Sequence, residues 1–156
     1  RQKVYIETSI ISYLTSRPSR DLIIAAHQQI TQVWWEERRK QFEIYISQLV
    51  YEEASKGDSE AAKNRIEIIS DLPILELNEN IKNLSNNFIQ SDIIPPKYVE
   101  DAFHISIATI HGMDYLLTWN CKHIANATIR TEIERLCREH GYINPIICTP
   151  EELMGE

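Results

Sequence analysis

The sequence of 156 residues lacks the features that mark several protein classes. Its cysteines, Cys121, Cys137 and Cys148, are odd in number and widely spaced, which argues against a disulfide framework and suits reduced thiols in a cytoplasm. No apolar run approaches the roughly 20 residues that span a bilayer, and the first residues lead directly into a strand pattern. We therefore expect no membrane span, no signal peptide and a cytoplasmic location.

Positive charge is scarce as well. Lysine and arginine number 16 against 23 aspartate and glutamate residues, which gives a formal net charge of -7. Phosphate contacts normally require an excess of positive charge, so this balance suits a nucleic-acid partner only if bound cations offset the acids locally. The candidates for phosphate contacts are the basic residues in or near predicted loops: Arg17, Arg20, Lys56, Lys122 and Arg130.

No charge run and no glycine- or serine-rich linker divides the chain, and its 43% hydrophobic content is enough for a core. We therefore expect one domain over residues 1–156. Five short β-branched or aromatic runs, each bounded by turn or capping residues, predict strands. These runs are residues 4–6, 44–46, 74–77, 115–118 and 146–148.

Helical patterns separate the predicted strands. Leu22, Ala26, Ile30 and Val33 repeat at helical spacing before a basic segment, residues 38–40, that suits a helix C-terminus. Further helical patterns are a segment that stops at Gly57, a helix capped by Asn78 with Ile81, Leu84 and Phe88 on one face, a helix from residues 95–96 to Gly112, and a stripe of Ile129, Ile133 and Leu136 that ends at Gly141. This alternation predicts a three-layer α/β/α fold, in which helices cover both faces of a central parallel sheet of four to five strands.

Four oxygen-bearing side chains fall at one edge of that sheet. Glu7 closes the first predicted strand, and Glu53 lies in the opening turns of a helix that Ser47 can cap. Asp101 begins a later helix, and Asn120 directly follows the fourth strand. In a parallel sheet the carboxyl ends of the strands share an edge with the helix N-termini, and ligands usually bind there. Carboxylate and amide oxygens suit Mg²⁺ or Mn²⁺, and clustered carboxylates repel one another unless a cation neutralises them.

Each of these residues also has a simpler explanation. Glu7 is equally able to cap a helix N-terminus, Glu53 to be surface charge, and Asn120 to serve a turn. Asp101 is harder to explain in this way, because the residues around it make its helix apolar on nearly all sides, and a carboxylate on so buried a helix needs a partner.

Other side chains near the predicted edge suggest further chemistry. The pairs Cys121 with His123 and His104 with His111 do not have the spacing of familiar structural zinc sites. Trp119 follows a strand at the site edge, which makes it a candidate for stacking on a nucleic-acid base.

Four segments of the chain resemble the motifs of the PIN-domain ribonucleases, many of which are toxin halves of bacterial toxin-antitoxin pairs. The segments are residues 4–9 (VYIETS), 47–57 (Ser, then an acid six residues later and a Gly four after that), 101–108 (DAFHISIA) and 117–124 (LTWNCKHI). Glu7 replaces the usual Asp, and His123 stands where a second Asp is common. A register error of one residue in the second motif would select Glu52 instead of Glu53.

The resemblance implies a metal-dependent endoribonuclease that cuts RNA by water attack. Glu7, Asp101 and Asn120 would hold the principal Mg²⁺ or Mn²⁺ ion, and Glu53 would bind a second ion or orient the water. The supporting residues would be Ser9 and Thr118, which orient the carboxylates, and His123, which contacts the site or the RNA.

The resemblance also implies partners, namely an RNA substrate and, if the chain is the toxin of a type II pair, an antitoxin protein. It further implies a homodimer, for which Tyr13, Leu14, Trp34 and Trp35 offer apolar surface. The alternative is a catalytically weakened PIN-like module that binds RNA or protein without cutting. The sequence leaves open which RNA is cut, and at which position.

Overall fold

A computed structural model describes residues 1–155 of the protein. All five predicted strands are present, and the third is shorter than expected because residues 76 and 77 continue as a loop. The strands are β1 (Gln2–Ile6), β2 (Phe42–Ser47), β3 (Ile74–Leu75), β4 (Tyr115–Leu117) and β5 (Ile146–Cys148).

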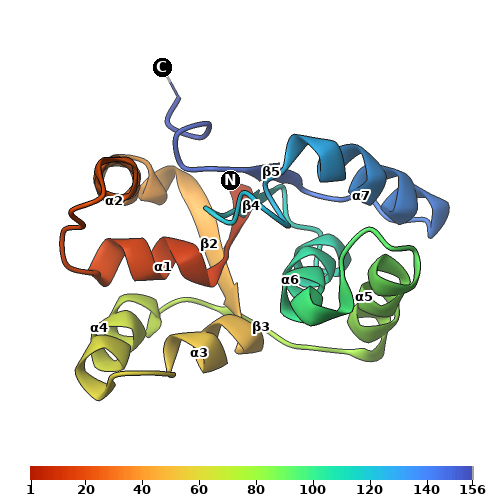
Figure 1. Cartoon of the computed structure of the whole chain (residues 1–156), viewed down its shortest axis with the longest axis horizontal. Coiled ribbons are helices and arrows are strands. Elements are labelled where there is room, and N and C mark those ends of the chain that lie inside the picture. Colours follow the sequence, from red (N-terminus) through yellow and green to blue (C-terminus); the bar gives the residue numbers. More distant parts are fainter. Residues whose placement is uncertain (156) are drawn as a thin grey trace.

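Within the described residues, seven α-helices flank the sheet in two layers. Helices α1 to α4 lie on one side of it and α5 to α7 on the other (Figure 1). The helices are α1 (Thr8–Thr15), α2 (Leu22–Glu37), α3 (Gln48–Ala54), α4 (Ser59–Ile69), α5 (Glu79–Gln90), α6 (Val99–Ile110) and α7 (Ala127–Glu139), with short 3₁₀ turns η1 (Arg39–Gln41) and η2 (Pro96–Tyr98). The predicted three-layer α/β/α fold with a parallel sheet is confirmed.

The sheet order places the candidate site. All neighbouring strands are parallel, and their order is β3-β2-β1-β4-β5. The chain therefore builds outward from β1 on one side and then returns to add β4 and β5 on the other. Such a reversal of strand order opens a crevice at the carboxyl ends of the two central strands, here β1 and β4, which is where open α/β sheets bind ligands.

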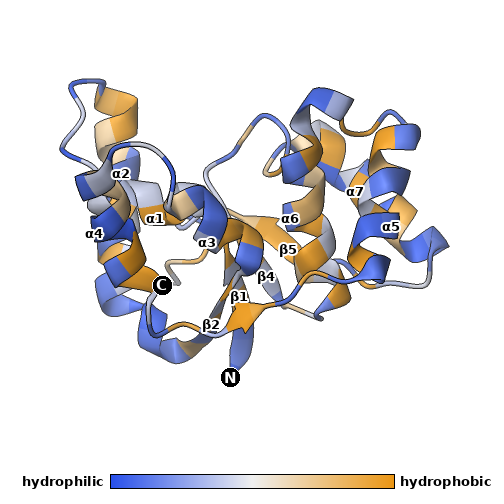
Figure 2. Cartoon of the chain, turned by 90° about the horizontal axis from the view of Figure 1, so that it is seen from below, coloured by the Kyte–Doolittle hydropathy of each residue, from blue (hydrophilic) through white to orange (hydrophobic). Residues whose placement is uncertain are grey.

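The core lies on both faces of this sheet, whose strands appear hydrophobic between more polar helix exteriors (Figure 2). Val4, Tyr5 and Ile6 of β1 are fully buried, as expected of a central parallel strand covered on both faces. None of the helices within residues 1–155 is both long and apolar enough to cross a membrane.

Helix α2 forms where the apolar spacing predicted a helix, but the apolar stripe is not its most buried face. Leu22, the first residue of the predicted apolar stripe, is 86% exposed, whereas Gln28, Thr31 and Trp34 are buried. Polar contacts select that face, because the Trp34 indole N–H donates to the Leu153 carbonyl at 3.2 Å and the Gln28 amide bonds to the loop before the helix. The apolar spacing therefore predicted the helix, and the polar contacts were needed to identify its buried face.

The aromatic surface expected for a dimer is also partly wrong. Trp34 is fully buried and stacks on Phe42, so it belongs to the core. Tyr13, Leu14 and Trp35 are only partly buried and pack against that core.

Candidate active site

Glu7 lies at the carboxyl end of β1 and forms the N-cap of α1. Its Oε2 accepts the backbone N–H of Ser9 at 3.2 Å, so the capping role that the sequence allowed is real. Its Oε1 accepts the hydroxyls of Ser9 at 2.5 Å and Thr118 at 2.6 Å. These hydroxyls, one from α1 and one from the segment after β4, link the carboxylate at the end of β1 to the neighbouring strand. They are the contacts that an orienting role for Ser9 and Thr118 requires.

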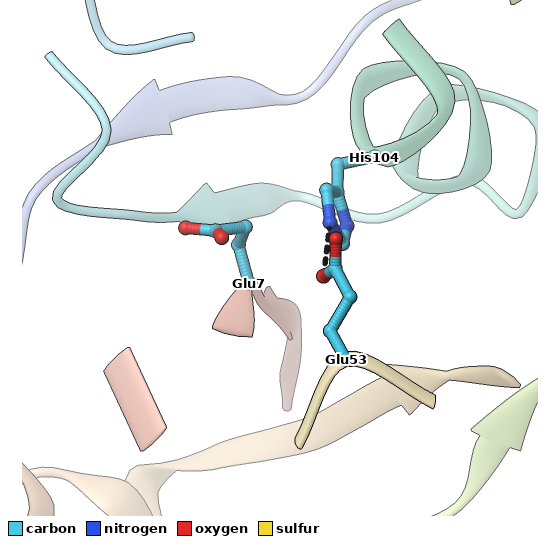
Figure 3. Close-up of side chains that lie close together, drawn as sticks. All are labelled: Glu7, Glu53 and His104. Atoms are coloured by element: carbon cyan, nitrogen blue, oxygen red, sulfur yellow. Dashed lines mark hydrogen bonds and ion pairs between the residues drawn. The ribbon is translucent and has the colours of Figure 1, made fainter. Parts of the chain in front are cut away.

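Glu53 reaches the same place from α3. Its Oε1 lies 2.8 Å from Nε2 of His104 on α6 and accepts the Thr8 hydroxyl at 2.5 Å. Figure 3 shows Glu53 extended from α3 toward His104, with Glu7 beside them at the end of β1. The neighbouring Glu52 is exposed to solvent. The structure thus turns Glu53, and not Glu52, toward the sheet edge.

A buried hydrogen-bond chain lies behind Glu53. The Tyr5 hydroxyl on β1 is 2.7 Å from Nδ1 of His104 and 2.8 Å from Oγ of Ser47. Ser47 caps α3 by accepting the Val50 N–H at 3.1 Å. Tyr5 and Ser47 are fully buried and His104 is 1% exposed, so the chain is shielded from water.

The carboxyl of Glu53 and the imidazole of His104 alter each other's ionisation. Burial disfavours the charged form of Glu53, but the hydrogen bond and charge of His104 outweigh it and lower the pKa of Glu53 to about 2. Burial likewise disfavours charge on His104, yet the hydrogen bond to Glu53 and the negative charges of Glu7, Glu53 and Asp101 raise its pKa. The imidazole is therefore surrounded by acids on its site-facing side.

Asp101 approaches the cluster from the first turn of α6. Its Oδ2 lies 3.3 Å from Nδ1 of His123, whose ring stacks on Tyr98 at 3.7 Å between centroids. Burial raises the pKa of Asp101, and a hydrogen bond from Asn120 opposes that rise. The amide oxygen of Asn120 is already used, since it accepts the backbone N–H groups of Lys122 and His123. Asn120 therefore serves the turn that the sequence allowed and presents its N–H₂ group to Asp101.

A further acid, Glu100, joins the cluster beside Glu53. A hydrogen bond with Glu53 raises the pKa of Glu100, and this bond requires a proton on one of the two carboxyl groups. Four acids thus gather at this edge, and only two imidazoles lie among them.

The donor set fits a hard divalent cation. One oxygen of Glu7, one oxygen of Glu53 and one ring nitrogen of His104 all lie within 4.8 Å of one another. Asp101 lies outside this compact group but close enough that its charge affects His104. Clustered carboxylates repel one another unless a cation neutralises them, and oxygen ligands suit Mg²⁺ or Mn²⁺. The residues present therefore fit such an ion.

Trp119 does not offer the stacking surface that its position suggested. Its side chain is 8% exposed, its ring stacks on His27 at 4.0 Å, and its indole N–H donates to Thr31 at 2.7 Å. The interpretation as a base-stacking residue was wrong, because α2 covers the indole.

Sequence reasoning missed three members of the cluster. His104 was considered only as half of a zinc pair, although it lies three residues after Asp101 and so on the same helix face. Tyr5 lies two residues before Glu7, on the same face of β1, and Glu100 directly precedes Asp101. Residues three apart on a helix, or two apart on a strand, share a face. This periodicity was the signal that could have identified His104 from Asp101 and Tyr5 from Glu7.

Comparison with known proteins identifies solved structures that share this fold. No protein-family model matches the sequence, and no curated protein matches it. VapBC2 from Rickettsia felis, solved bound to a DNA fragment from its promoter, is 19% identical, with 95% of this chain and 98% of that chain covered and a TM-score of 0.59. VapBC-1 from nontypeable Haemophilus influenzae is 16% identical, with 96% and 99% covered and a TM-score of 0.60.

A third structure covers less of the chain. VapC20 from Mycobacterium tuberculosis, described as a sarcin-ricin loop cleaving toxin, is 12% identical, with 77% of this chain and 92% of that chain covered and a TM-score of 0.59. At these identities the likeness concerns the fold, and it confirms in three dimensions the resemblance that the motifs suggested. The chain shares the three-layer α/β/α fold of VapC toxins, the PIN-domain toxins of VapBC pairs.

Proposed function

We propose that this protein is an endoribonuclease that uses Mg²⁺ or Mn²⁺ to hydrolyse RNA phosphodiester bonds. The observation that carries the proposal is that Glu7 and Glu53 each bring a carboxylate oxygen within 4.8 Å of the other and of a His104 nitrogen at the carboxyl edge of the sheet, with Asp101 close enough for its charge to act on His104. The shared fold with VapC20, described as a toxin that cleaves the sarcin-ricin loop, supports RNA as the substrate class.

The three carboxylates would hold the cation. When bound, such an ion makes a water ligand more acidic and stabilises the charge that develops on the phosphate. Glu7 is fixed by two hydroxyls, and Oε1 of Glu53 is held by Thr8 and His104. A second ion or the attacking water would take the place of Glu100 as the further partner of Glu53. Both acids are therefore oriented before substrate arrives, which favours catalysis.

Asn120 and His123 would orient the carboxylate of Asp101. The motif resemblance implied that Asn120 is a ligand of the ion. Because its amide oxygen accepts two backbone N–H groups, we propose instead that Asn120 orients Asp101. His123 lies 3.3 Å from Asp101 and is 19% exposed, so it can also donate to a bound phosphate.

The test is cleavage of a defined RNA by the purified protein with Mn²⁺, with and without EDTA. Asp101→Asn and Glu53→Gln are each expected to reduce the rate at least about a hundredfold, while Glu52→Gln, which removes an exposed charge one position away, leaves it unchanged. The expected products carry 5′-phosphate and 3′-hydroxyl ends. Cleavage that EDTA does not diminish, or products with cyclic phosphate ends, would contradict the proposal.

A binding module without catalysis is the second candidate. It is favoured by the arrangement of Glu7, whose two oxygens already accept three hydrogen bonds within the protein. Thermal melting with and without Mn²⁺ separates the candidates, because an ion at a hundred times its dissociation constant stabilises the folded state by about 2.7 kcal/mol. A melting shift that Asp101→Asn abolishes supports the nuclease, and no shift supports the binder.

We further propose that the protein acts in the cytoplasm as the toxin of a type II toxin-antitoxin pair. The similar structures of VapBC2 and VapBC-1 support this assignment. An antitoxin is expected to place an arginine among Glu7, Glu53 and Asp101, since its guanidinium pairs well with carboxylates and competes with the ion. A small reading frame beside the gene, whose product co-purifies with this chain and suppresses cleavage, is the expected finding.

A further inference from the structure

The role of His104 depends on where the protons of the buried chain lie. In residues 1–155, Ser47 Oγ has two hydrogen-bond partners, the N–H of Val50 and the hydroxyl of Tyr5. The Val50 N–H is a donor, so the proton of the Ser47 hydroxyl has Tyr5 Oη as its acceptor. Because buried hydroxyl protons are nearly always paired, Ser47 donates to Tyr5.

The direction of the hydrogen bond from Ser47 to Tyr5 fixes the direction of the next two hydrogen bonds, from Tyr5 to His104 and from His104 to Glu53. Tyr5 Oη accepts from Ser47, so its own proton is donated to Nδ1 of His104, 2.7 Å away. With Nδ1 as an acceptor, the proton of the neutral imidazole lies on Nε2, from which it is donated to Glu53 Oε1 at 2.8 Å. Protonation of the ring also leaves a proton on Nε2. In either state Nε2 has no lone pair for a cation.

We propose that His104 is a positioning residue, which orients Glu53 for the ion through Nε2–H and does not bind the ion itself. The inference rests on the proposed metal site and refines it. It differs from what proximity suggests, since the His104 nitrogen and the Glu7 and Glu53 oxygens are close enough to share one ion. Tyr5 and Ser47 hold the ring so that its N–H meets Oε1 of Glu53.

Two substitutions separate the two sides of the ring. The amide nitrogen of glutamine can take the place of Nε2, so His104→Gln keeps a donor to Glu53. The shorter asparagine reaches only the position of Nδ1, so His104→Asn keeps the side facing Tyr5 and loses the donor. If His104 merely filled space, the two variants would bind Mn²⁺ alike. If His104 were a ligand of the ion, both variants would lose Mn²⁺ affinity to the same extent.

The experiment measures Mn²⁺ binding to the full chain by calorimetry and by electron paramagnetic resonance. We expect His104→Gln to bind Mn²⁺ within about threefold of the wild type and His104→Asn to bind at least about tenfold more weakly, as for other residues that orient a ligand. Pulsed spectra of Mn²⁺ on the wild-type protein should show no coupling to a directly bound imidazole nitrogen. That measurement needs no variant, so it remains decisive if either substitution prevents folding.

The outcomes separate this inference from the proposed function. Nitrogen coupling in the wild type, or equal Mn²⁺ affinities of the two variants, overturns the positioning role while the metal site stands. A wild-type protein that binds no Mn²⁺ overturns the metal site and the positioning role together. A protein that binds Mn²⁺ and discriminates the variants but cuts no RNA supports the positioning role and contradicts the nuclease.

Discussion

At the scale of single residues, Glu7 shows how a side chain one methylene longer than the usual aspartate is held. Its Oε1 accepts hydroxyls from Ser9 and Thr118, which fix the carboxylate at the reach of a glutamate. We predict that Glu7→Asp lowers Mn²⁺-dependent cleavage, although it restores the residue common in PIN motifs. A misplacement of about 1 Å can cost roughly a hundredfold in rate.

The measurement is the single-turnover rate of RNA cleavage at saturating Mn²⁺. Glu43→Asp is the matched control, because Glu43 is an exposed residue of β2 and the same shortening there should leave the rate unchanged. A large increase in the cleavage rate with Glu7→Asp would show that the natural glutamate attenuates the activity. Such a result would support the binding-module interpretation.

The pair of Glu53 and His104 predicts how stability depends on pH. Glu53 has a pKa lowered from 4.5 to about 2, so its contribution to the free energy of unfolding is present above pH 4.5 and is lost as the pH falls toward 2. His104 has a pKa raised above 6.5, so its contribution is complete below pH 6.5 and is lost as the pH rises through the raised value. The pair is therefore most stabilising between pH 4.5 and 6.5.

Guanidinium unfolding of the wild type and Glu53→Gln in EDTA checks this window. The difference in unfolding free energy between the two proteins should be largest between pH 4.5 and 6.5 and should shrink on both sides. A difference that stays constant from pH 3 to 8 would show that the two groups do not interact as described.

At the scale of elements, the side chains that cap α1 and α3 beside the site, Glu7 and Ser47, each also have another partner. Ser47 caps α3, which carries Glu53, and contacts Tyr5, whereas Asn78 caps α5 with no such link. We predict that Ser47→Ala and Asn78→Ala each destabilise the fold by about 1–2 kcal/mol, and that only Ser47→Ala weakens Mn²⁺ binding. Denaturant unfolding and calorimetry measure the two effects, and equal Mn²⁺ affinities would contradict the link.

The strands and the edge they form were predictable, because β-branched runs and the ends of elements are local properties of the sequence. Helix α4 was missed, since only Ala62 and Ile69 of its residues are buried and its apolar stripe is faint. The buried face of α2 was not predicted, because it includes Thr31 and Trp34, whose hydrogen-bond partners lie 88 and 119 positions away in the sequence.

The same distinction holds within the site. The placement of Glu7, Glu53 and Asp101 at one edge of the sheet was predictable, because each stands at the end of a strand or in the opening turns of a helix. The amide orientation of Asn120 was not, since it follows from the backbone of the turn after it. The role of His104 also needed the fold, because Tyr5 and Glu53 lie 99 and 51 positions away in sequence.

At the scale of the whole molecule, we predict a homodimer. With Trp34 in the core, the apolar surface left for association includes the start of α2, where Leu22 is 86% and Ile23 is 69% exposed. Such neighbouring exposed apolar side chains are typical of interaction surfaces. Light scattering at tens of micromolar protein should give twice the chain mass of 18.2 kDa, and a monomer mass would contradict the prediction.

The hydrogen bond from the Thr118 hydroxyl to Glu7 has a consequence for protein synthesis. The two residues are 111 positions apart, so a ribosome that has delivered β1 must still make most of the chain before this contact is available. Contacts between residues so distant in sequence form late in folding. A nascent or truncated chain that ends before β4 therefore lacks the Thr118 hydroxyl that helps to orient Glu7. For the proposed nuclease, a fully oriented Glu7 would therefore require translation to pass β4.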